Sequence, residues 1–313
     1  MSHAEPAKAR SRSPTSQERL PAYPGSTPGR CLLCGSSNGP IVAYEAGYYG
    51  RACSCGTVYI DPEPPPEAVD PREDHHIEAY YVLPAHLRLK WVAQWKPAGR
   101  LLEVGCGPGH FLAAAMAHGY EVAAVEPNAR CAEEVFRRLR VQVEQAFIEE
   151  CSQPKASYDV VFHVDLLSHF PDPIRALKAM ASLLRPGGVL CFEVGIFAGL
   201  SPRWYRWIGR LGYPQHRWFY SEAAIHQLLD RAGLKVDAMK RFGLFPATIL
   251  STVGNRFLRS PEDKPRGRDG RPAPTRGLNK IYSRLQYLLR YRIGAFVPPV
   301  GPHAVFVTAS PKS

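Results

Sequence analysis

The stretch Leu101–Leu112, with the sequence LLEVGCGPGHFL, constrains the fold of this chain more than any other segment. An apolar run leads into glycines at positions 105, 107 and 109, and an apolar, alanine-rich run follows from 111 to 117. This order predicts a buried strand, a tight turn and the start of a helix, because glycine adopts turn conformations that other residues avoid. Glycines also let a ligand approach the main chain, where the free N–H groups of the helix start await an acceptor.

Acidic residues on both sides of this turn narrow the class of ligand. A dinucleotide-binding turn, G-x-G-x-x-G, requires glycine at position 110, where this chain has His110. Glu103 lies two residues before the first glycine, and a second apolar strand, 120–125, ends in Glu126. An acid at the end of the second strand can reach a ribose diol. The alternative is an ordinary strand-to-helix turn followed by a surface glutamate.

The remainder of the chain continues with a regular alternation of strands and helices. Hydrophobic spacing predicts strands near 100–105, 121–126, 141–144, 158–164, 188–195, 234–241 and 303–309. It predicts helices near 82–95, 109–118, 128–139, 173–184 and 221–232. Such alternation is typical of an α/β, doubly wound fold with a largely parallel sheet and helices on both faces.

With these elements in place, the chain resembles the class I S-adenosylmethionine-dependent methyltransferases over roughly residues 78–313. The family pattern E-x-G-x-G-x-G matches at Glu103, Gly105, Gly107 and Gly109, and its ribose-binding acid matches at Glu126. Segments similar to later family motifs are Tyr158–Phe162, Leu167–Pro173 and Leu184–Gly188. The resemblance implies a Rossmann-like sheet of seven strands, the last antiparallel, and S-adenosylmethionine as the methyl donor.

The donor should lie beyond the carboxyl ends of the strands, where ligands bind in doubly wound sheets. The resemblance implies that the glycines pack against the methionine part and that Glu126 accepts from both ribose hydroxyls. Asn128 follows this acid and is placed to cap the next helix. Phe147 is either an adenine contact or a core residue, and Tyr81 either closes over the donor or only packs. The candidate cofactor-binding residues are Tyr81, Glu103, Gly105, Gly107, Gly109, Glu126, Asn128, Phe147 and His163.

Candidate catalytic residues follow the fourth predicted strand of the sheet. Transfer to a hydroxyl requires a base that removes its proton, and the candidates are His169, His216 and Asp165, with His163 as a further one. His169 matches the histidine of the family motif L-E-H-x-P-D-P. Relatives acting on catechols place two acids and this histidine around a divalent metal. Here Ser168 replaces one acid, which argues against metal binding at this position.

Four cysteines near the N-terminus form two pairs beside glycines. They are Cys31 and Cys34, then Cys53 and Cys55. Paired cysteines next to glycine turns are typical of zinc knuckles, and four thiolates can surround one tetrahedral zinc ion. The module resembles the zinc ribbon that precedes some methyltransferase domains, except that its second pair is C-x-C. Either Cys53 takes the third ligand position through a shift of register, or the site has three thiolates.

Composition divides the chain into segments. We predict a disordered tail (1–29), a zinc-ribbon-like module (30–62), a proline-rich linker (63–77) and the methyltransferase domain (78–313) with an aromatic, arginine-containing lid (196–220) and a basic insertion (244–302). Within 254–292 eleven Lys and Arg face three Asp and Glu, a net charge of +8. This segment is either a solvated insertion or a contact for an anionic partner such as a membrane surface.

We therefore expect a methyltransferase that acts on a small molecule or a carbohydrate in a biosynthetic pathway. An enzyme acting on RNA or protein is the first alternative, although we expect no nucleic-acid partner, and a non-catalytic binding protein that retained the fold is the second. No apolar signal segment begins the chain and no run of eighteen apolar residues occurs, so we expect a cytoplasmic location with reduced thiols. Neither the acceptor atom nor the oligomeric state can be predicted from these patterns.

Overall fold

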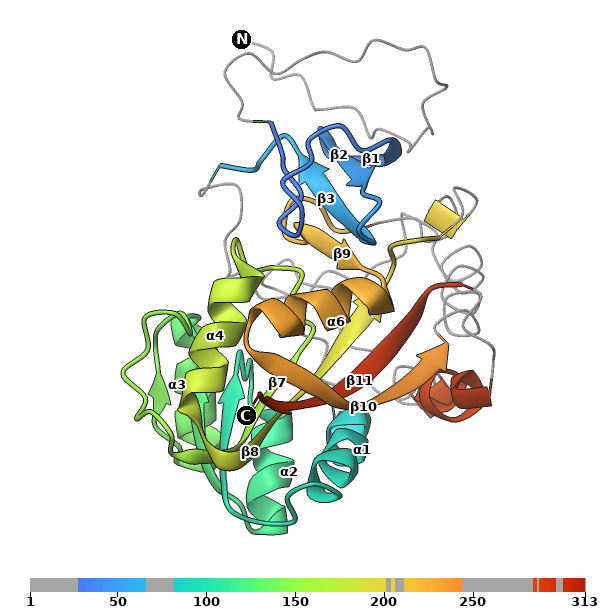
Figure 1. The fold of residues 1–313 in the computed structure, drawn as a ribbon. Helices are drawn as coiled ribbons and strands as arrows, with labels where there is room; N and C mark the ends of the chain where they lie inside the picture. Colours follow the sequence, from blue (N-terminus) through green and yellow to red (C-terminus); the bar gives the residue numbers. More distant parts are fainter. Residues whose placement is uncertain are drawn as a thin grey trace, which may run out of the picture.

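A parallel sheet forms the centre of the structure, a computed structural model that describes residues 28–65, 82–200, 204–205, 211–243, 284–285, 287–296 and 301–312 (Figure 1). Its strands are β4 (Arg100–Val104), β5 (Glu121–Val125), β6 (Val143–Glu144), β7 (Tyr158–Val164), β8 (Leu184–Ile196), β10 (Leu234–Gly243) and β11 (His303–Pro311). They lie in the order β6-β5-β4-β7-β8-β11-β10. β11 is antiparallel to both of its neighbours, whereas the other pairs among β4 to β8 are parallel. The predicted fold class, with its reversed last strand, is confirmed.

Five helices flank this sheet at the predicted places. They are α1 (Val82–Ala93), α2 (His110–His118), α3 (Ala129–Leu139), α4 (Pro173–Leu183) and α6 (Glu222–Arg231). Three begin at a side-chain cap that satisfies free backbone N–H groups: Asn128 for α3, Asp172 for α4 and Ser221 for α6. The expected capping role of Asn128 is thereby confirmed.

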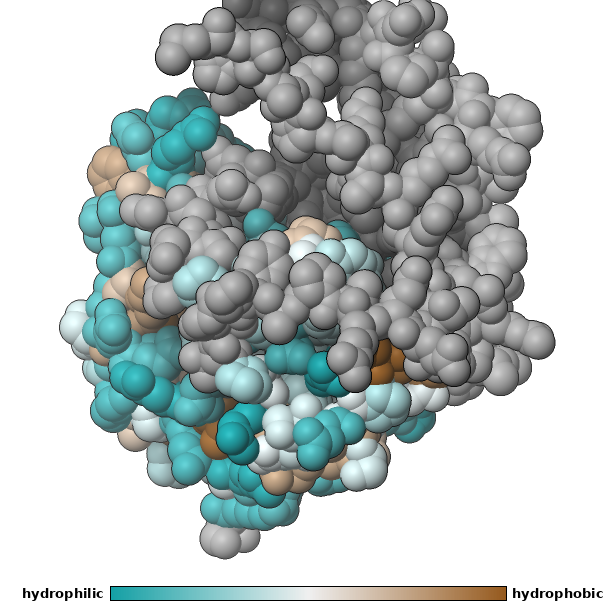
Figure 2. All heavy atoms as spheres, turned by 90° about the horizontal axis from the view of Figure 1, so that it is seen from above, coloured by the Kyte–Doolittle hydropathy of each residue, from teal (hydrophilic) through white to brown (hydrophobic). Residues whose placement is uncertain are grey.

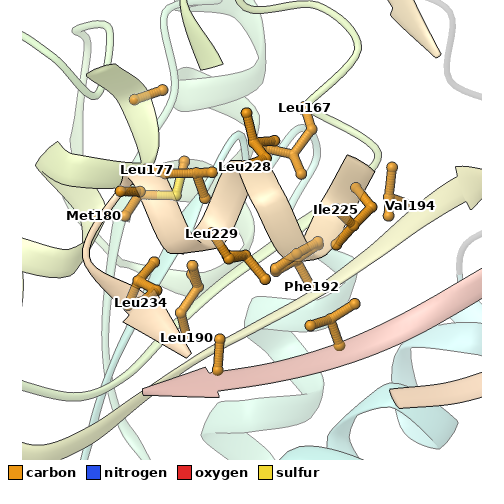
Figure 3. Packing of buried hydrophobic residues seen from close by; sticks show 14 of the residues in the cluster. Leu167, Leu177, Met180, Leu190, Phe192, Val194, Ile225, Leu228, Leu229 and Leu234 are labelled. Atoms are coloured by element: carbon orange, nitrogen blue, oxygen red, sulfur yellow. The ribbon is translucent and has the colours of Figure 1, made fainter. Parts of the chain in front are cut away.

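The two faces of the sheet bury separate apolar cores. α4 and α6 cover one face, where Leu177, Ile225 and Leu228 pack on Leu190 and Phe192 of β8 (Figure 3). α1 and α2 cover the other face through residues such as Leu89 and Phe111. α3 packs beside α2 over β5 and β6. Both faces being covered explains why β7 is buried along nearly its whole length.

Four further strands extend the sheet beyond the seven that we expected. β1 (Ile41–Glu45), β2 (Tyr48–Ala52) and β3 (Thr57–Asp61) form an antiparallel meander in the cysteine module. β3 pairs with β9 (Trp218–Tyr220), and β9 pairs with the last residue of β8. Periodicity missed these strands because they are short, and because β9 lies inside the segment that we interpreted as a lid.

Segment boundaries predicted from composition fall partly outside the described residues. Gly29, expected in the tail, donates its N–H to Asp61 and so belongs to the module. Of the basic insertion 244–302, the structure describes only short pieces, among them the π-helical turn η3 (Leu288–Ile293), whose Tyr291 is buried against the sheet. Of the lid, 201–203 and 206–210 lie outside the described residues.

The surface seen from above is mainly hydrophilic where described residues reach it, with scattered hydrophobic groups between them (Figure 2). Among the helices of the described residues, none has the length and apolar character that crossing a membrane requires.

Candidate active site

The glycine turn after β4 brings the ends of two strands together. Gly105 donates its N–H to the carbonyl of Val125, at 2.8 Å. The carboxylate of Glu126 accepts from the N–H of Gly107 through Oε2 and from that of Asn128 through Oε1, each at 2.9 Å. Glu126 is therefore fixed at the end of β5, beside the glycines and at the edge where the donor should bind.

Two of the glycines are required both by close packing and by their backbone conformation. A Cβ atom on Gly109 would lie 2.8 Å from Cγ2 of Val135, so this glycine lets α2 approach α3 closely. A Cβ atom on Gly105 would lie 2.6 Å from Cδ1 of Leu166. Both have a positive φ, 66° at Gly105 and 77° at Gly109, a region that favours glycine. The geometry thus gives Gly109 a structural role, and its predicted donor contact stays a prediction.

Glu103 is buried and has a side-chain oxygen that lacks a partner among the described residues, Oε2. Burial and the nearby Glu126 raise the pKa of Glu103 well above its usual range, whereas the N–H of Leu112 and the Arg88 guanidinium lower it. A cation beside Oε2 would favour the ionised carboxylate. The ammonium of a methionine moiety supplies such a cation, so this oxygen fits the predicted donor.

Of the other predicted donor contacts, Phe147 is exposed, Asn128 is buried and Tyr81 is not described. Phe147 follows β6 and is 46% exposed, so its ring is free to contact a ligand rather than being a core residue. Asn128 is buried and uses its side-chain oxygen to cap α3. Tyr81 lies outside the described residues.

His163 is enclosed on the face of β7 that α4 and α6 cover. The side chain is 0% exposed, and its ring stacks on Phe192 with centroids 4.9 Å apart. Neither ring nitrogen has a hydrogen-bond partner among the described residues. In this arrangement the ring of His163 is closed to solvent, its predicted donor contact stays a prediction, and burial lowers its pKa to about 3.

This burial predicts a pH-dependent loss of stability. Since the pKa of His163 is lower in the folded than in the unfolded protein, the unfolded chain binds an extra proton between about pH 3 and pH 6.5. His163→Phe removes the group that binds this proton and keeps an aromatic ring stacked on Phe192. The variant should gain free energy of unfolding relative to the wild type, and this gain should be about 2 kcal/mol larger at pH 5 than at pH 7.5. Urea denaturation at both pH values measures this difference, and an identical pH dependence in the two proteins would contradict the buried, neutral histidine.

The three candidate catalytic residues lie around the loop that follows β7. Asp165 is exposed and has a φ of 57°, a strained backbone conformation that is common at functional sites. The rings of His169 and His216 lie 4.3 Å apart between centroids. Nδ1 of His216 lies 2.8 Å from the hydroxyl of Ser168, and the N–H of Arg217 donates to the Ser168 carbonyl. The loop after β7 thus brings His169 next to His216, although the two residues are far apart in the sequence.

A buried charged cluster beside this loop was not predicted from the sequence. Glu193 of β8 is 2% exposed and accepts from Arg88 of α1 at 2.8 Å and from Arg290 at 2.6 Å. Tyr291 also donates to it. Burial alone would raise the pKa of Glu193, but the two guanidinium groups hold it below its usual range. Arg88, which is buried, and Arg290, which is partly exposed, come from helical segments where arginine usually faces solvent, so the sequence carries no signal for their pairing with Glu193.

The four predicted metal ligands converge at one end of the module. Their sulfur atoms all lie within 4.8 Å of one another, with Cys31 and Cys55 3.3 Å apart and Cys34 and Cys53 3.2 Å apart. A tetrahedral zinc ion with Zn–S distances of about 2.3 Å separates its sulfurs by about 3.8 Å. A turn closed by the Gly56 N–H and the Cys53 carbonyl directs both C-x-C sulfurs inward. The geometry therefore fits four thiolate ligands, Cys53 included.

Comparison with known proteins shows that this chain is similar to methyltransferases. A family model described as "Methyltransferase domain" matches residues 74–239. A ubiquinone biosynthesis O-methyltransferase of Xanthomonas axonopodis pv. citri is 33% identical over 172 residues, which cover 48% of this chain and 70% of the relative. The protein of the same name from Aeromonas salmonicida is 34% identical over 188 residues, covering 54% of this chain and 77% of the relative.

Solved structures share the fold at low identity. A putative sarcosine dimethylglycine methyltransferase from Galdieria sulphuraria has a TM-score of 0.52 and 14% identity, over 74% of this chain and 87% of that one. A geranyl diphosphate C-methyltransferase from Streptomyces coelicolor A3(2), solved with S-adenosyl-L-homocysteine, has a TM-score of 0.50 and 15% identity, over 79% of this chain and 94% of that one.

Proposed function

Because the chain belongs to the methyltransferase-domain family, we propose that it transfers a methyl group from S-adenosylmethionine to a hydroxyl of a small molecule or a carbohydrate. The observation that carries the proposal is the pairing of His169, on the loop after β7, with His216, which lies just before β9 and whose ring is 4.3 Å away between centroids. The carboxyl ends of β4, β5 and β7 meet at one edge of the sheet, so this loop faces the same edge as the glycine turn. The named relatives are O-methyltransferases, which supports an oxygen acceptor.

In this proposal, residues at the ends of β4 and β5 hold the donor. Oε2 of Glu103, which has no partner among the described residues, pairs with the donor's ammonium. Glu126 accepts hydrogen bonds from the donor's ribose hydroxyls in addition to the one from the Gly107 N–H. Phe147 supplies an exposed ring for the adenine. S-adenosylmethionine, when bound, supplies an already activated methyl group. The chain's own residues then need only to position the acceptor, exclude water and remove a proton.

Proton removal falls to the histidine pair. His216 bonds to Ser168 through Nδ1, and such a bond fixes the ring orientation and leaves Nε2 for the acceptor. As the acceptor oxygen attacks the methyl carbon, its proton passes to a histidine nitrogen, and the donor leaves as S-adenosylhomocysteine. Asp165, exposed at the end of β7, is the next candidate for this role.

A turnover screen tests the proposed activity. The purified protein is incubated with S-adenosylmethionine and a library of phenols, sugars and other hydroxylated metabolites, and release of S-adenosylhomocysteine is measured. Turnover of hydroxyl compounds supports the proposal. Turnover confined to RNA or protein substrates would support the first alternative instead.

Replacing Glu126 tests the donor site without any acceptor. Glu126→Ala removes the acceptor for the ribose hydroxyls, so we expect donor binding to weaken by roughly 1.5–3 kcal/mol. Calorimetry with S-adenosylhomocysteine measures the loss. Glu133→Ala, at an exposed position of α3, is the control for the change in charge. Unchanged affinity in Glu126→Ala would remove this residue from the donor site.

We also propose that Cys31, Cys34, Cys53 and Cys55 hold one structural zinc ion. The support is the convergence of four sulfur atoms in a module too small to form a large core of its own. A site closed by four protein ligands leaves no open position for substrate, so the metal would stabilise the module rather than take part in methyl transfer.

A further inference from the structure

The cysteine module pairs with β9, the strand whose Trp218 and Tyr220 side chains donate to the loop after β7. β11 occupies one side of β8 up to Ile196, which pairs with His303, so β9 must pair with Ile196 from the opposite side. That is the side of β7, whose pairing with β8 ends at Glu193. β9 therefore continues where β7 stops, and β3 of the module pairs with its outer edge (Figure 1).

One carboxylate of the module holds the turn that carries His216. Glu45, the last residue of β1, accepts from the N–H of Leu211 at 2.6 Å and from that of Gly212 at 3.3 Å, both through Oε2. The carbonyl of Gly212 in turn accepts from the N–H of His216 at 3.1 Å. Gly212 therefore links Glu45 to the backbone of His216 through two hydrogen bonds.

The ring of His216 has little freedom inside this turn. A Cβ atom on Gly212, whose φ is 80°, would lie 2.7 Å from Cδ2 of His216. On other sides the ring bonds to Ser168 at 2.8 Å and stacks near Phe219 at 5.9 Å between centroids. A shift of the 211–216 turn would therefore move the ring relative to Ser168 and His169.

We infer that Glu45 is a positioning residue for His216, and that the N-terminal module takes part in the acceptor site through this contact. The inference rests on the proposed function in that His216 acts on the acceptor. It assigns the module a second role, because the module then contributes to methyl transfer through a hydrogen-bonded turn rather than through stability alone. A misplacement of about 1 Å in a reacting group lowers rates by about 100-fold.

Histidine NMR tests the position of the ring without an acceptor. In protein carrying ¹³C-labelled histidine, the ring signal of His216 is assigned by its loss in His216→Ala. We expect Glu45→Ala to shift or broaden this signal and to leave calorimetric binding of S-adenosylhomocysteine unchanged. Glu45→Gln keeps a side-chain carbonyl oxygen as acceptor and should restore the wild-type signal. Glu133→Ala, on exposed α3, is the charge-matched control.

Turnover of the hydroxyl substrate found in the screen gives the second readout. Glu45→Ala should lower kcat about 10- to 100-fold, and the double variant with His216→Ala should be no slower than His216→Ala alone. An unmoved NMR signal or an unchanged kcat in Glu45→Ala would overturn the inference. If the signal moves and kcat falls in Glu45→Ala while His216→Ala keeps its kcat, the base assignment fails, and Glu45 acts by a route other than His216.

Discussion

His216→Ala is expected to lower kcat by roughly 10²–10⁴-fold, the usual contribution of a positioned general base. The imidazole is held by Ser168 and lies against His169, and alanine leaves no group there to accept the proton. Donor affinity should stay the same, because the donor contacts that we propose follow β4, β5 and β6. Steady-state kinetics with a hydroxyl substrate, together with calorimetry for the donor, measures both effects.

The pH dependence of the rate and a second variant, at His169, discriminate between the candidate bases His216, His169 and Asp165. Histidine side chains ordinarily titrate between pH 5 and 8, so a histidine base predicts a rate that falls as the pH decreases through this range. His169→Ala, on the loop after β7, is the matched variant because its ring lies against that of His216. If both single variants keep the wild-type kcat and a flat profile, neither histidine is the base, and Asp165 becomes the candidate. A large effect in only one of them identifies which ring receives the proton.

The donor edge could be predicted from the sequence because its information is local. Glu103 to Gly109 and Glu126 to Asn128 are short runs in which strand, turn and cap follow each other, and the hydrogen bonds of Glu126 join residues that those runs already name. Asn128 could be predicted as a cap for the same reason. Periodicity likewise placed the seven strands of the main sheet within a few residues.

The acceptor side depends on contacts between residues that are distant in the chain. Glu45 lies 166 residues from Leu211, and Arg88 lies 105 residues from Glu193. No spacing rule connects such pairs, and glutamate and arginine, the residue types of Glu45, Arg88 and Glu193, are typical of a solvated surface. The burial of His163 could not be predicted for a related reason. Strand alternation gives the face on which a side chain lies, but not whether helices α4 and α6 close over that face.

Removing zinc is expected to unfold the cysteine module and to lower the thermal stability of the whole chain. Structural zinc sites bind their metal with apparent free energies of about 10–16 kcal/mol, and that energy is folding energy when the apo module is too small to fold alone. Cys31→Ser at the buried ligand should release the metal, whereas Cys151→Ser, outside the cluster, should not. Elemental analysis of protein purified without a metal-affinity tag should give one zinc per chain, and Cys31→Ser much less.

The pairing of β3 with β9 extends this prediction to the acceptor side of the site. If loss of the metal releases β3, the Trp218–Tyr220 strand loses its outer partner, and the adjoining turn at His216 loses the support of Glu45. The metal-free protein should therefore keep its affinity for S-adenosylhomocysteine, since Glu103 and Glu126 lie away from β9, and lose turnover. A zinc content near zero, with all four cysteines alkylated in the native protein, would contradict the metal site. Disulfides between the neighbouring sulfurs, detected by mass spectrometry before reduction, would instead identify a covalent link as the staple of the module.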